Sequence, residues 1–279
     1  SGLLLLGAGT DSNEAAALNY TLDAIDIYSN SWGPDDDGRL HPSGPLFIQA
    51  VANGVTNGRD GLGAIYSWAG GNGRQHTEEM PGEDNSNYDG WANSRYVNAI
   101  AAIGSDGLYS SYSEAGANIL VAAPSNSWRY GTSAITTTDI VGYAGYSTDD
   151  YAYDFGGTSS ACPLFSGVVA LILDANENLT WRDVQHILVN SARMNDPNDS
   201  SWGINDAGHD VSHKYGFGAV DAGAAVSLAE NWTNVDEELN LSFGPFSPSF
   251  TIPTSTNTWS EFDVQITDDI SLESIDVVV

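Results

Sequence analysis

Short apolar segments alternate with segments of helical periodicity over most of this chain, and that alternation is the strongest constraint on its fold. Strands that alternate with helices pack as a parallel sheet with helices on both faces. The pattern therefore predicts an α/β fold with a doubly wound, mostly parallel sheet. Strands are expected at residues 3–8, 25–32, 63–69, 97–103 and 119–123, and helices at residues 13–23, 46–55, 164–173, 180–192 and 220–230.

The pattern changes in the last part of the chain. Residues 243–258 are rich in Pro, Ser and Thr, and apolar residues then alternate with polar ones over residues 262–266. A period of two is typical of β-strands. We therefore expect an α/β domain at residues 1–235 and the beginning of an all-β domain at residues 236–279, with the last expected strand still running where the sequence stops.

Acidic residues dominate the charge of the chain. It has 37 Asp and Glu against 8 Lys and Arg, a formal net charge of −29. Such a surface repels nucleic acid and anionic lipid and attracts cationic ligands such as basic peptides. No nucleic-acid partner is expected. A salt-adapted or very soluble secreted protein would also explain most of these acids, so only acidic residues within a motif point to a site.

Cys162 is the only cysteine, so the chain holds no internal disulfide framework. It lies in an apolar helix start, where we expect a small buried side chain rather than a nucleophile. No stretch is expected to approach the roughly 18 apolar residues of a membrane span. Residues 3–6 are too short for a signal peptide and lack a preceding basic residue, so they indicate a buried strand and a chain that begins inside a fold.

Residues 156–163 read GGTSSACP and lead directly into the apolar run at residues 164–173. Small residues let the backbone come close to a substrate. The first N–H groups of a helix, at the positive end of its dipole, can stabilise a developing oxyanion. The segment can therefore present Ser159 as a nucleophile. Turns are rich in such residues in any case, so this interpretation depends on partner motifs elsewhere.

Six motifs in a fixed order strengthen the interpretation. They read YSNSWGPDDDG at residues 28–38, WAGGNG at 68–73, DGWANS at 89–94, GTSSA at 157–161, LTWRDVQH at 179–186 and SHKYGFGAVDA at 212–222. Together they resemble the kexin/furin branch of the subtilisin-like serine peptidases (peptidase S8), the proprotein convertases. The resemblance covers about residues 3–235, and residues 236–279 resemble the start of the P (Homo B) domain that follows the catalytic domain in that branch.

The resemblance implies a catalytic role for two residues. Ser159 falls on the nucleophile, and Asn72 falls on the side chain that binds the oxyanion together with the backbone N–H of Ser159. A neutral amide suits that place because it stabilises the tetrahedral intermediate without titrating. The alternative for Asn72 is an ordinary turn residue among glycines.

The resemblance also implies roles for four acidic residues. Asp36 and Asp89 fall on carboxylates at the base of the S1 pocket, where charge-assisted hydrogen bonds would hold a substrate arginine. Asp36, Asp84 and Glu114 fall on a calcium site beside that pocket. Three carboxylates from separate loops would repel one another without a hard cation, and oxygen ligands suit Ca²⁺. The alternative is a solvated acidic loop in an acidic protein.

Further substrate-binding residues follow from the resemblance. Glu14 and Trp91 fall on contacts of the S4 subsite. Ser43 stands where an additional S4 aspartate would be, so recognition of a P4 basic residue should be weaker than is typical of the family. The motif at residues 28–38 falls on the loop that lines the S1 pocket in the family, here called the S1 loop. It supplies a four-residue segment, of which the first three residues resemble a segment that pairs with the substrate backbone as an added strand. That segment consists of Ser31, Trp32, Gly33 and Pro34, and for Trp32 core packing is an equal alternative.

A peptidase of this type needs a histidine general base and an aspartate that orients it. Family members carry them in Asp-Ser/Asp-Gly and His-Gly-Thr segments, upstream of the matched region. The chain has five histidines and none precedes Gly-Thr, so ordinary surface or packing roles are expected for His41, His76, His186, His209 and His213. Two readings stay open: part of an active enzyme cut at both ends, which we favour, or a non-catalytic acidic pseudo-peptidase that binds peptides.

The sequence thus predicts a calcium-dependent serine endopeptidase that cleaves after arginine at basic sites by Ser-His-Asp acyl-enzyme chemistry. The segment with the catalytic Asp and His is expected to be missing here, so this chain alone is expected to be inactive. The implied cofactor is Ca²⁺. The implied partners are peptide or protein substrates with basic residues and the protein's own pro-segment, and the implied location is secreted, extracellular or in the cell envelope.

Overall fold

A computed structural model describes residues 9–74, 84–242, 244 and 273. The chain divides into two compact units, Ser1–Val235 and Asp236–Val279. The helices, strands and site described below all belong to the first unit. The strand expected at residues 3–8 and the strands expected after residue 258 lie outside the described residues.

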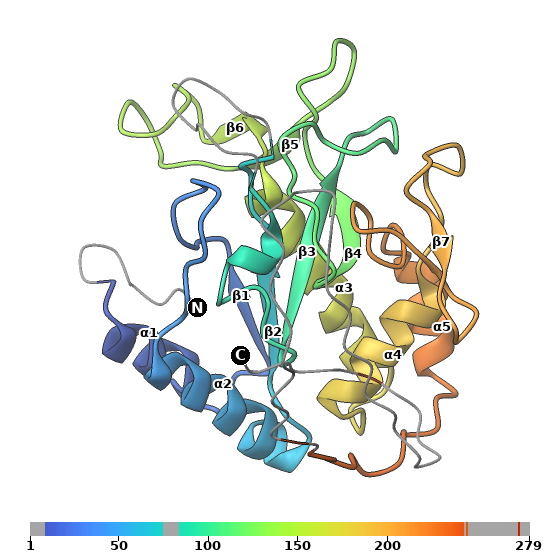
Figure 1. The fold of residues 1–279 in the computed structure, drawn as a ribbon. Coiled ribbons are helices and arrows are strands. Elements are labelled where there is room, and N and C mark those ends of the chain that lie inside the picture. The colour runs from blue at the N-terminus through green and yellow to red at the C-terminus, as the bar shows by residue number, and fades with distance from the viewer. Residues whose placement is uncertain (1–8, 75–83, 243, 245–272, 274–279) are drawn as a thin grey trace, which may run out of the picture. The chain divides into compact units, whose positions relative to one another are not determined.

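Four parallel strands form the centre of the first unit (Figure 1). They lie side by side in chain order: β1 (Ile27–Asn30), β2 (Ile65–Ala69), β3 (Val97–Ile103) and β4 (Ile119–Pro124). β2 and β3 are buried over their whole length, as expected of strands covered on both faces. Because the strands are parallel, the residues that follow them meet at one edge of the sheet, where ligand sites of such sheets form.

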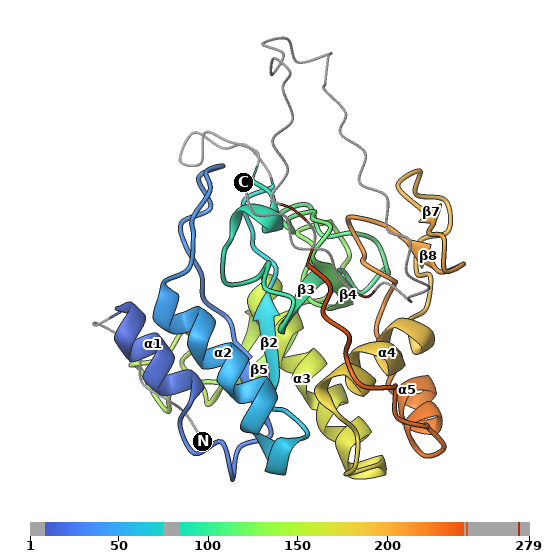
Figure 2. The same cartoon turned by 60° about the horizontal axis from the view of Figure 1, so that its bottom comes forward.

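Two helices cover one face of the sheet, α1 (Asp11–Leu18) and α2 (Pro45–Asn57) (Figure 2). Phe47 and Val51 of α2 pack with Tyr66 and Trp68 of β2 in a first hydrophobic core. The Asp11 carboxylate accepts hydrogen bonds from the backbone N–H groups of Leu46 and Phe47, 3.0 and 2.8 Å away, and so ties α1 to the start of α2.

Three helices cover the other face: α3 (Thr158–Ala175), α4 (Trp181–Ser191) and α5 (Ala222–Ala229). Phe165 and Ile172 of α3 pack with Ile100 and Val121 of the sheet in a second hydrophobic core. The expected α/β architecture, a parallel sheet with helices on both faces, is therefore present. Strand order does not reverse among the described strands, so the doubly wound order of the sheet stays a prediction.

Helix α3 corrects one expectation. Its 18 residues have a mean hydropathy of 1.5, so by length and composition this helix could cross a membrane. No stretch of that kind was expected from the sequence. The helix packs against all four strands, and its apolar character is that of a helix in the core of a layered domain.

The expected elements occur within the described residues, with shifted ends. The largest shift is in α3, which begins at Thr158 rather than at residue 164 and so includes Ser159 and Cys162. Several short elements were not expected. They are the antiparallel pairs β5 (Ile135–Thr138) with β6 (Tyr151–Phe155) and β7 (Gly203–Ile204) with β8 (Asp210–Val211), and the 3-10 helices η1 (Arg59–Gly61) and η2 (Ser86–Tyr88).

Cys162 is fully buried, as the sequence predicts. Its Sγ donates to the carbonyl oxygen of Asn30 at 3.4 Å. Burial raises the pKa of the thiol to about 11, which keeps it protonated at neutral pH. The residue therefore serves packing between α3 and β1.

Candidate active site

Ser159 lies in the first turn of α3. Helix α3 begins at the edge of the sheet where the strands end (Figure 1). The turn before it depends on two glycines. Gly157, the N-cap residue, has φ +74°, which side chains rarely adopt. A Cβ on Gly156 would lie 2.1 Å from the Asn126 side chain. The Gly-Gly sequence therefore lets the chain turn tightly enough to place Ser159 at the start of the helix.

Asn72 follows β2 and is held against this turn by Thr158. The Asn72 Oδ1 accepts from the Thr158 N–H at 2.8 Å and from the Thr158 Oγ1 at 3.0 Å. The Thr158 Oγ1 in turn accepts from the Gly71 N–H at 3.2 Å. Because the amide oxygen of Asn72 is occupied in this way, its Nδ2 is the end that can donate to a bound group. The sequence predicted this residue beside Ser159, and the structure brings the two segments together.

Pro163 explains a second link in the first turns of α3. Proline has no N–H, so the carbonyl of Ser159 lacks its usual intrahelical donor four residues on. The Ser31 Oγ donates to that carbonyl instead, at 2.9 Å. Ser31 follows β1, and the bond ties the S1 loop segment to the backbone of the expected nucleophile.

A network of hydrogen-bonded hydroxyl groups stabilises the turn before Ser159. The Ser125 Oγ, at the end of β4, donates to the carbonyl oxygen of Gly157 at 2.7 Å. It also lies 2.7 Å from the Ser160 Oγ and 2.9 Å from the Tyr112 OH. Ser125, Ser160 and Tyr112 are all buried. Buried hydroxyls that satisfy one another hold the backbone of the turn in one position.

Three carboxylates come together beside Asn72. One ligand atom each of Asp36, Asp84 and Glu114 lies within 4.8 Å of the others, and Asp84 and Glu114 are buried. Glycines make this approach possible, because a Cβ on Gly71 would lie 2.3 Å from the Glu114 carboxyl group and one on Gly73 would lie 2.5 Å from Asp36 Cβ. The structure thus brings together the three residues predicted as a metal site, from three separate loops.

The geometry fits a hard cation. Ca²⁺ binds oxygen ligands at about 2.3–2.6 Å, so two ligands on opposite sides of the ion are about 5 Å apart. Backbone N–H groups already serve part of the cluster: Gly73 donates to Glu114 at 2.9 Å and Asn72 donates to Asp36 at 3.3 Å. Burial raises the pKa of Glu114 and of Asp36. Repulsion from Asp36 and Asp84 adds to the shift of Glu114, and repulsion from Asp84 adds to the shift of Asp36, which a hydrogen bond with Glu114 partly offsets. A cation among them would relieve that repulsion.

Asp89 is held next to Gly33 of the S1 loop. Its Oδ1 accepts from the backbone N–H groups of Trp91 and Ala92 at 2.7 and 3.2 Å. A Cβ on Gly33 would lie 3.0 Å from the Asp89 Oδ2, so the glycine leaves room at that oxygen. Burial raises the pKa of Asp89 to about 6, with smaller contributions from Asp36 and Asp84. A cationic ligand at Oδ2 would favour the ionised form.

In the S1 loop segment after β1, exposed residues alternate with residues that pack against the protein. The Trp32 carbonyl accepts from the Trp68 indole N–H at 2.7 Å, and the Trp32 ring packs edge-on against the Trp68 and Trp91 rings. Trp32 therefore packs in the protein, the alternative left open above. Ser31 and Gly33 on either side are exposed. In an extended chain neighbouring residues face opposite ways, so Ser31 and Gly33 are the positions that can pair with another strand. Pro34 is half-buried.

Glu14 and Trp91 form a pair. The Trp91 indole N–H donates to the Glu14 Oε2 at 2.8 Å. Glu14 is buried in α1, and Trp91 also packs against Phe47 of α2. The structure therefore joins the two residues that were predicted as S4 contacts.

No described histidine is hydrogen-bonded to the Ser159 side chain. His41 Nε2 lies 2.9 Å from an Asp37 carboxylate oxygen, on the loop that pairs with Asp89. His209 packs edge-on against Phe217, and the His213 carbonyl accepts from the Gly116 N–H. His186 lies in α4, and His76 lies outside the described residues. The described part of the chain thus brings the expected nucleophile and the expected oxyanion donor together, with no described histidine hydrogen-bonded to the Ser159 side chain.

Some site residues were not found from the sequence. Thr158 orients Asn72, and Ser125 and Ser160 hold the Gly157 carbonyl. Thr158 could have been recognised, because it stands between the N-cap glycine and Ser159 in the motif. Ser125 had no sequence signal, since its partners come from segments far away in the chain.

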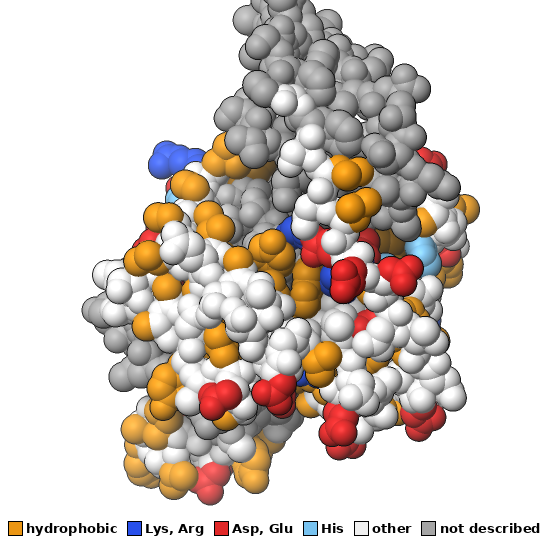
Figure 3. Space-filling model, turned by 90° about the horizontal axis from the view of Figure 1, so that it is seen from below, with side chains coloured by type: hydrophobic (Ala, Val, Ile, Leu, Met, Phe, Trp, Pro, Cys, Tyr) orange, Lys and Arg blue, Asp and Glu red, His pale blue; other side chains and the backbone are white. Residues whose placement is uncertain are grey.

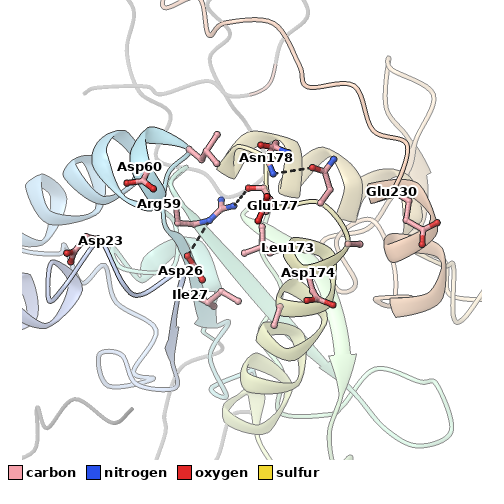
Figure 4. A pocket seen from close by; sticks show the side chains of 14 residues that line it. Asp23, Asp26, Ile27, Arg59, Asp60, Leu173, Asp174, Glu177, Asn178 and Glu230 are labelled. Carbon is pink, nitrogen blue, oxygen red and sulfur yellow. Dashed lines mark hydrogen bonds and ion pairs between the residues drawn. The ribbon is translucent and has the colours of Figure 1, made fainter.

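A separate cavity of about 1090 Å³ lies at the other end of α3 (Figure 4). Its residue Asp174 is 15 residues from Ser159 on the same helix, or about 22 Å. The Arg59 guanidinium there donates to the carbonyls of Leu179 and Glu177 and lies 3.7 Å from Asp26, as Figure 4 shows in part. Arg59 thus joins loops. Among the described residues on the face seen from below, acidic side chains occur in several places and basic ones in few (Figure 3).

Comparisons with known proteins agree with this geometry. The subtilase family (Peptidase_S8) matches residues 4–218. Furin of Homo sapiens is 42% identical over 235 residues, which are 83% of this chain and 28% of furin. Kexin of Saccharomyces cerevisiae is 42% identical over 266 residues, which are 94% of this chain and 30% of kexin. The chain therefore spans less than a third of the length of these relatives.

Solved structures show the same fold. The serine protease of Aeromonas sobria is 25% identical with a TM-score of 0.72, over 82% of this chain and 47% of that chain. The same protease in complex with a chaperone gives a TM-score of 0.73 at 25% identity, over 84% of this chain and 48% of that chain. On the match of sequence and fold, the chain belongs to the subtilase family and, within it, to the kexin/furin branch.

Proposed function

We propose that the whole protein is a calcium-dependent serine endopeptidase that cleaves after arginine at basic sites. The observation that carries the proposal is the position of Ser159 in the first turn of α3 beside Asn72, whose Oδ1 is occupied by Thr158. That arrangement leaves the Asn72 Nδ2 and the Ser159 N–H as donors to an oxyanion. Kinship with furin and kexin supports a serine endopeptidase.

In this mechanism the Ser159 Oγ attacks the carbonyl carbon of the scissile peptide bond. A histidine from a part of the protein outside the described residues takes the hydroxyl proton and passes it to the leaving amine, and an aspartate orients that histidine. The carbonyl oxygen becomes an oxyanion, which Asn72 and the Ser159 N–H stabilise. Water then hydrolyses the acyl-enzyme by the same path and releases Ser159.

Arginine specificity would come from Asp89 together with Asp36. The open Oδ2 of Asp89 beside Gly33 offers a planar guanidinium a charge-assisted hydrogen bond. Ser31 and Gly33 would pair with the substrate backbone, with Pro34 ending the segment, while Trp32 packs inside. The Glu14–Trp91 pair would line S4. Ser43 in place of an acidic residue would weaken recognition of a P4 basic side chain.

Calcium would be held by Asp36, Asp84 and Glu114. When bound, it would neutralise charge among the three carboxylates. The residues themselves would then hold three loops together: the S1 loop through Asp36, the loop before Asp89 through Asp84, and the loop against Gly71 and Gly73 through Glu114. The cluster is therefore a positioning device for S1 and for Asn72.

The remaining proposals rest on the kexin/furin kinship. Residues 236–279 begin a P domain, the protein acts outside the cytoplasm, either secreted or in the cell envelope, and its own pro-segment assists folding. The Aeromonas sobria protease forms a complex with a chaperone, which supports an assisting partner of some kind.

Labelling with a fluorophosphonate tests the proposal. The whole protein, isolated from its source, should be labelled at Ser159 and should hydrolyse an arginine-ending fluorogenic peptide, and Ser159→Ala should abolish both. The alternative function is a non-catalytic acidic protein that binds peptides, which the lack of a described histidine at Ser159 favours. Binding of an arginine peptide by a whole protein that neither labels nor cleaves would support that alternative.

A further inference from the structure

The segment between β4 and α3 carries an exposed aromatic hairpin, residues 135–155, formed by β5 and β6. Tyr151 and Tyr153 are two residues apart on β6 and share one face, and Phe155 follows beyond a shift in the β5–β6 register. The three side chains are 49%, 59% and 36% exposed. Tyr143 and Tyr146 in the loop are 95% and 96% exposed. Among the described residues these five rings make no aromatic or cation–π contact. Soluble proteins rarely leave so many aromatic rings together without a partner.

All charged residues of the same hairpin are acidic. Residues 135–155 include four aspartates and no Lys, Arg or His. Asp149 accepts from the Tyr151 N–H at 3.0 Å and from the Tyr153 OH at 3.3 Å, so a carboxylate sits beside the exposed rings. Asp139 is held in the same loop by the N–H groups of Ile140 and Ser147. Aromatic faces beside carboxylates favour a cation, and the hairpin supplies none itself.

The hairpin is next to the expected nucleophile. Phe155 ends β6 four residues before Ser159, so the two are at most about 14 Å apart along the chain. In Figure 1 the hairpin lies at the top of the sheet edge, and α1, which carries Glu14, lies at the lower left. A peptide bound with its arginine at Asp89 and its preceding residues toward Trp91 and Glu14 would therefore send its following residues toward the hairpin.

We propose that the aromatic hairpin binds arginine or lysine side chains of the substrate polypeptide on the C-terminal side of the scissile bond. The inference rests on the proposed function, because it takes Asp89 as the site of the arginine before that bond. Tyr143 and Tyr146 would stack on the cationic side chains, and Asp149 and Asp150 would neutralise them. Such contacts are exposed and individually weak, so together they should change affinity about 5- to 30-fold.

Binding by the 279-residue chain in calcium buffer tests the proposal without requiring turnover. Three labelled peptides of equal length share a central arginine: one has lysines and arginines after it, one has them before it, and one has serines on both sides. Calorimetry or fluorescence anisotropy gives the affinities. We expect the first peptide to bind about 5- to 30-fold more tightly than the serine peptide. Equal affinities, or a gain only for the second peptide, would overturn the proposal.

Matched variants separate the hairpin from the negative charge of the whole molecule. The double variant Tyr143→Ser/Tyr146→Ser keeps the net charge and should remove the gain for the first peptide. The variant Tyr20→Ser, which removes a ring that is 55% exposed in another part of the chain, should keep it. A gain that survives in the hairpin variant would be diffuse attraction and would overturn the proposal, as would tyrosine-dependent binding of phosphatidylcholine vesicles in place of the peptide.

Asp89→Asn distinguishes failure of the hairpin from failure of the arginine pocket. If the pocket is right and the hairpin wrong, Asp89→Asn weakens all three peptides while the first peptide shows no gain. If Asp89→Asn changes no affinity but the gain for the first peptide persists and needs Tyr143 and Tyr146, the pocket assignment fails. The hairpin then still stands as a site for a basic segment.

Discussion

At the scale of single residues, the site depends on how side chains are oriented by neighbours that do not react. Thr158 occupies the Asn72 oxygen, and Ser31 occupies the Ser159 carbonyl that Pro163 leaves without a donor. Asp89 keeps one oxygen on backbone N–H groups and the other beside Gly33. In each case the residue type was suggested by a motif, and a tertiary contact decides which atom faces the ligand.

The variant Asp89→Asn tests the arginine pocket and its pH dependence. Its amide oxygen can still accept from the Trp91 and Ala92 N–H groups, so the fold should persist. Loss of a charge-assisted bond should weaken an arginine peptide about 10- to 100-fold. In the wild type, affinity should fall as pH drops through about 6, where Asp89 becomes protonated while arginine stays charged. Titration calorimetry from about pH 7.5 to about pH 5 measures both, and a pH-independent wild type would contradict the pocket.

Replacement of Thr158 by Val tests the orientation of Asn72. Valine keeps the shape but removes the Oγ1 that donates to Asn72 and accepts from Gly71. In the whole enzyme we expect kcat to fall about 10- to 100-fold with little change in KM, because a mispositioned oxyanion donor acts in the transition state. Thr158→Ser is the matched control and should retain most activity. A larger effect on KM than on kcat would show that Thr158 acts on substrate binding instead.

At the scale of elements, predictions succeeded where periodicity was strong and failed where tertiary contacts define the element. Strand β3 has the predicted bounds, and α4 begins within one residue of its predicted start, where Thr180 and Asp183 form a capping box. The first six residues of α3 were not predicted as helix, because Ser, Thr and Pro favour turns. In the structure, Ser31 after β1 and Asn72 after β2 bond to this turn. The hairpin of β5 and β6 was missed because its exposed aromatic rows have no apolar partner face.

Asp183 gives an element-scale prediction. It is fully buried, accepts from Thr180 at the start of α4, and also accepts from the Trp232 indole and the Val235 N–H at 2.9 and 2.7 Å. Asp183→Ala should cost about 3 kcal/mol of unfolding free energy, because several buried donors lose their acceptor. Thr180→Ala removes only the cap and should cost about 1 kcal/mol. Urea unfolding of both variants checks the order, and equal losses would contradict the second role of Asp183.

At the scale of the whole molecule, negative charge accumulates on the surface and at one buried point. The formal net charge is −29, and the single lysine, Lys214, is already paired with Asp199. Surface repulsion of this kind is screened by any salt over about 10 Å at 0.1 M. The cluster of Asp36, Asp84 and Glu114 is mostly buried, and screening reaches it less, so a bound cation should matter there beyond general ionic strength.

Stability in EDTA should fall as pH rises. The folded-state pKa values of Asp36, Asp89 and Glu114 lie above their unfolded values, so the folded state binds more protons than the unfolded state. Their stabilising contribution is present in full below about pH 4. For Asp89 it is lost as pH rises through about 6, and for Glu114 the loss continues at higher pH. Thermal unfolding between about pH 4 and about pH 8 tests the sign, and a melting temperature that rises over this range would contradict it.

Calcium and sodium chloride should act differently on the melting temperature at about pH 7.5. Millimolar CaCl₂ should raise it in the wild type and have little effect in Asp84→Asn, which breaks the cluster. Sodium chloride at about 1 M should raise it in both, since it screens surface charge. Ser200→Ala, at an exposed position elsewhere, is the matched control. Equal calcium effects in the wild type and in Asp84→Asn would remove the cluster as a calcium site.

The sequence by itself determined the layered α/β architecture, the position of the expected nucleophile segment at a helix start and the acidity of the candidate site, because periodicity and residue chemistry are local properties. Only the tertiary structure decided which groups meet. Asn72 and Thr158 bond across 86 positions of chain, and the carboxylates of three loops meet where parallel strands end. The pKa of Asp89 and the exposure of the rings in the aromatic hairpin likewise depend on tertiary packing. The burial of a side chain is set by all the segments that pack around it, so it cannot be read from one segment of the sequence.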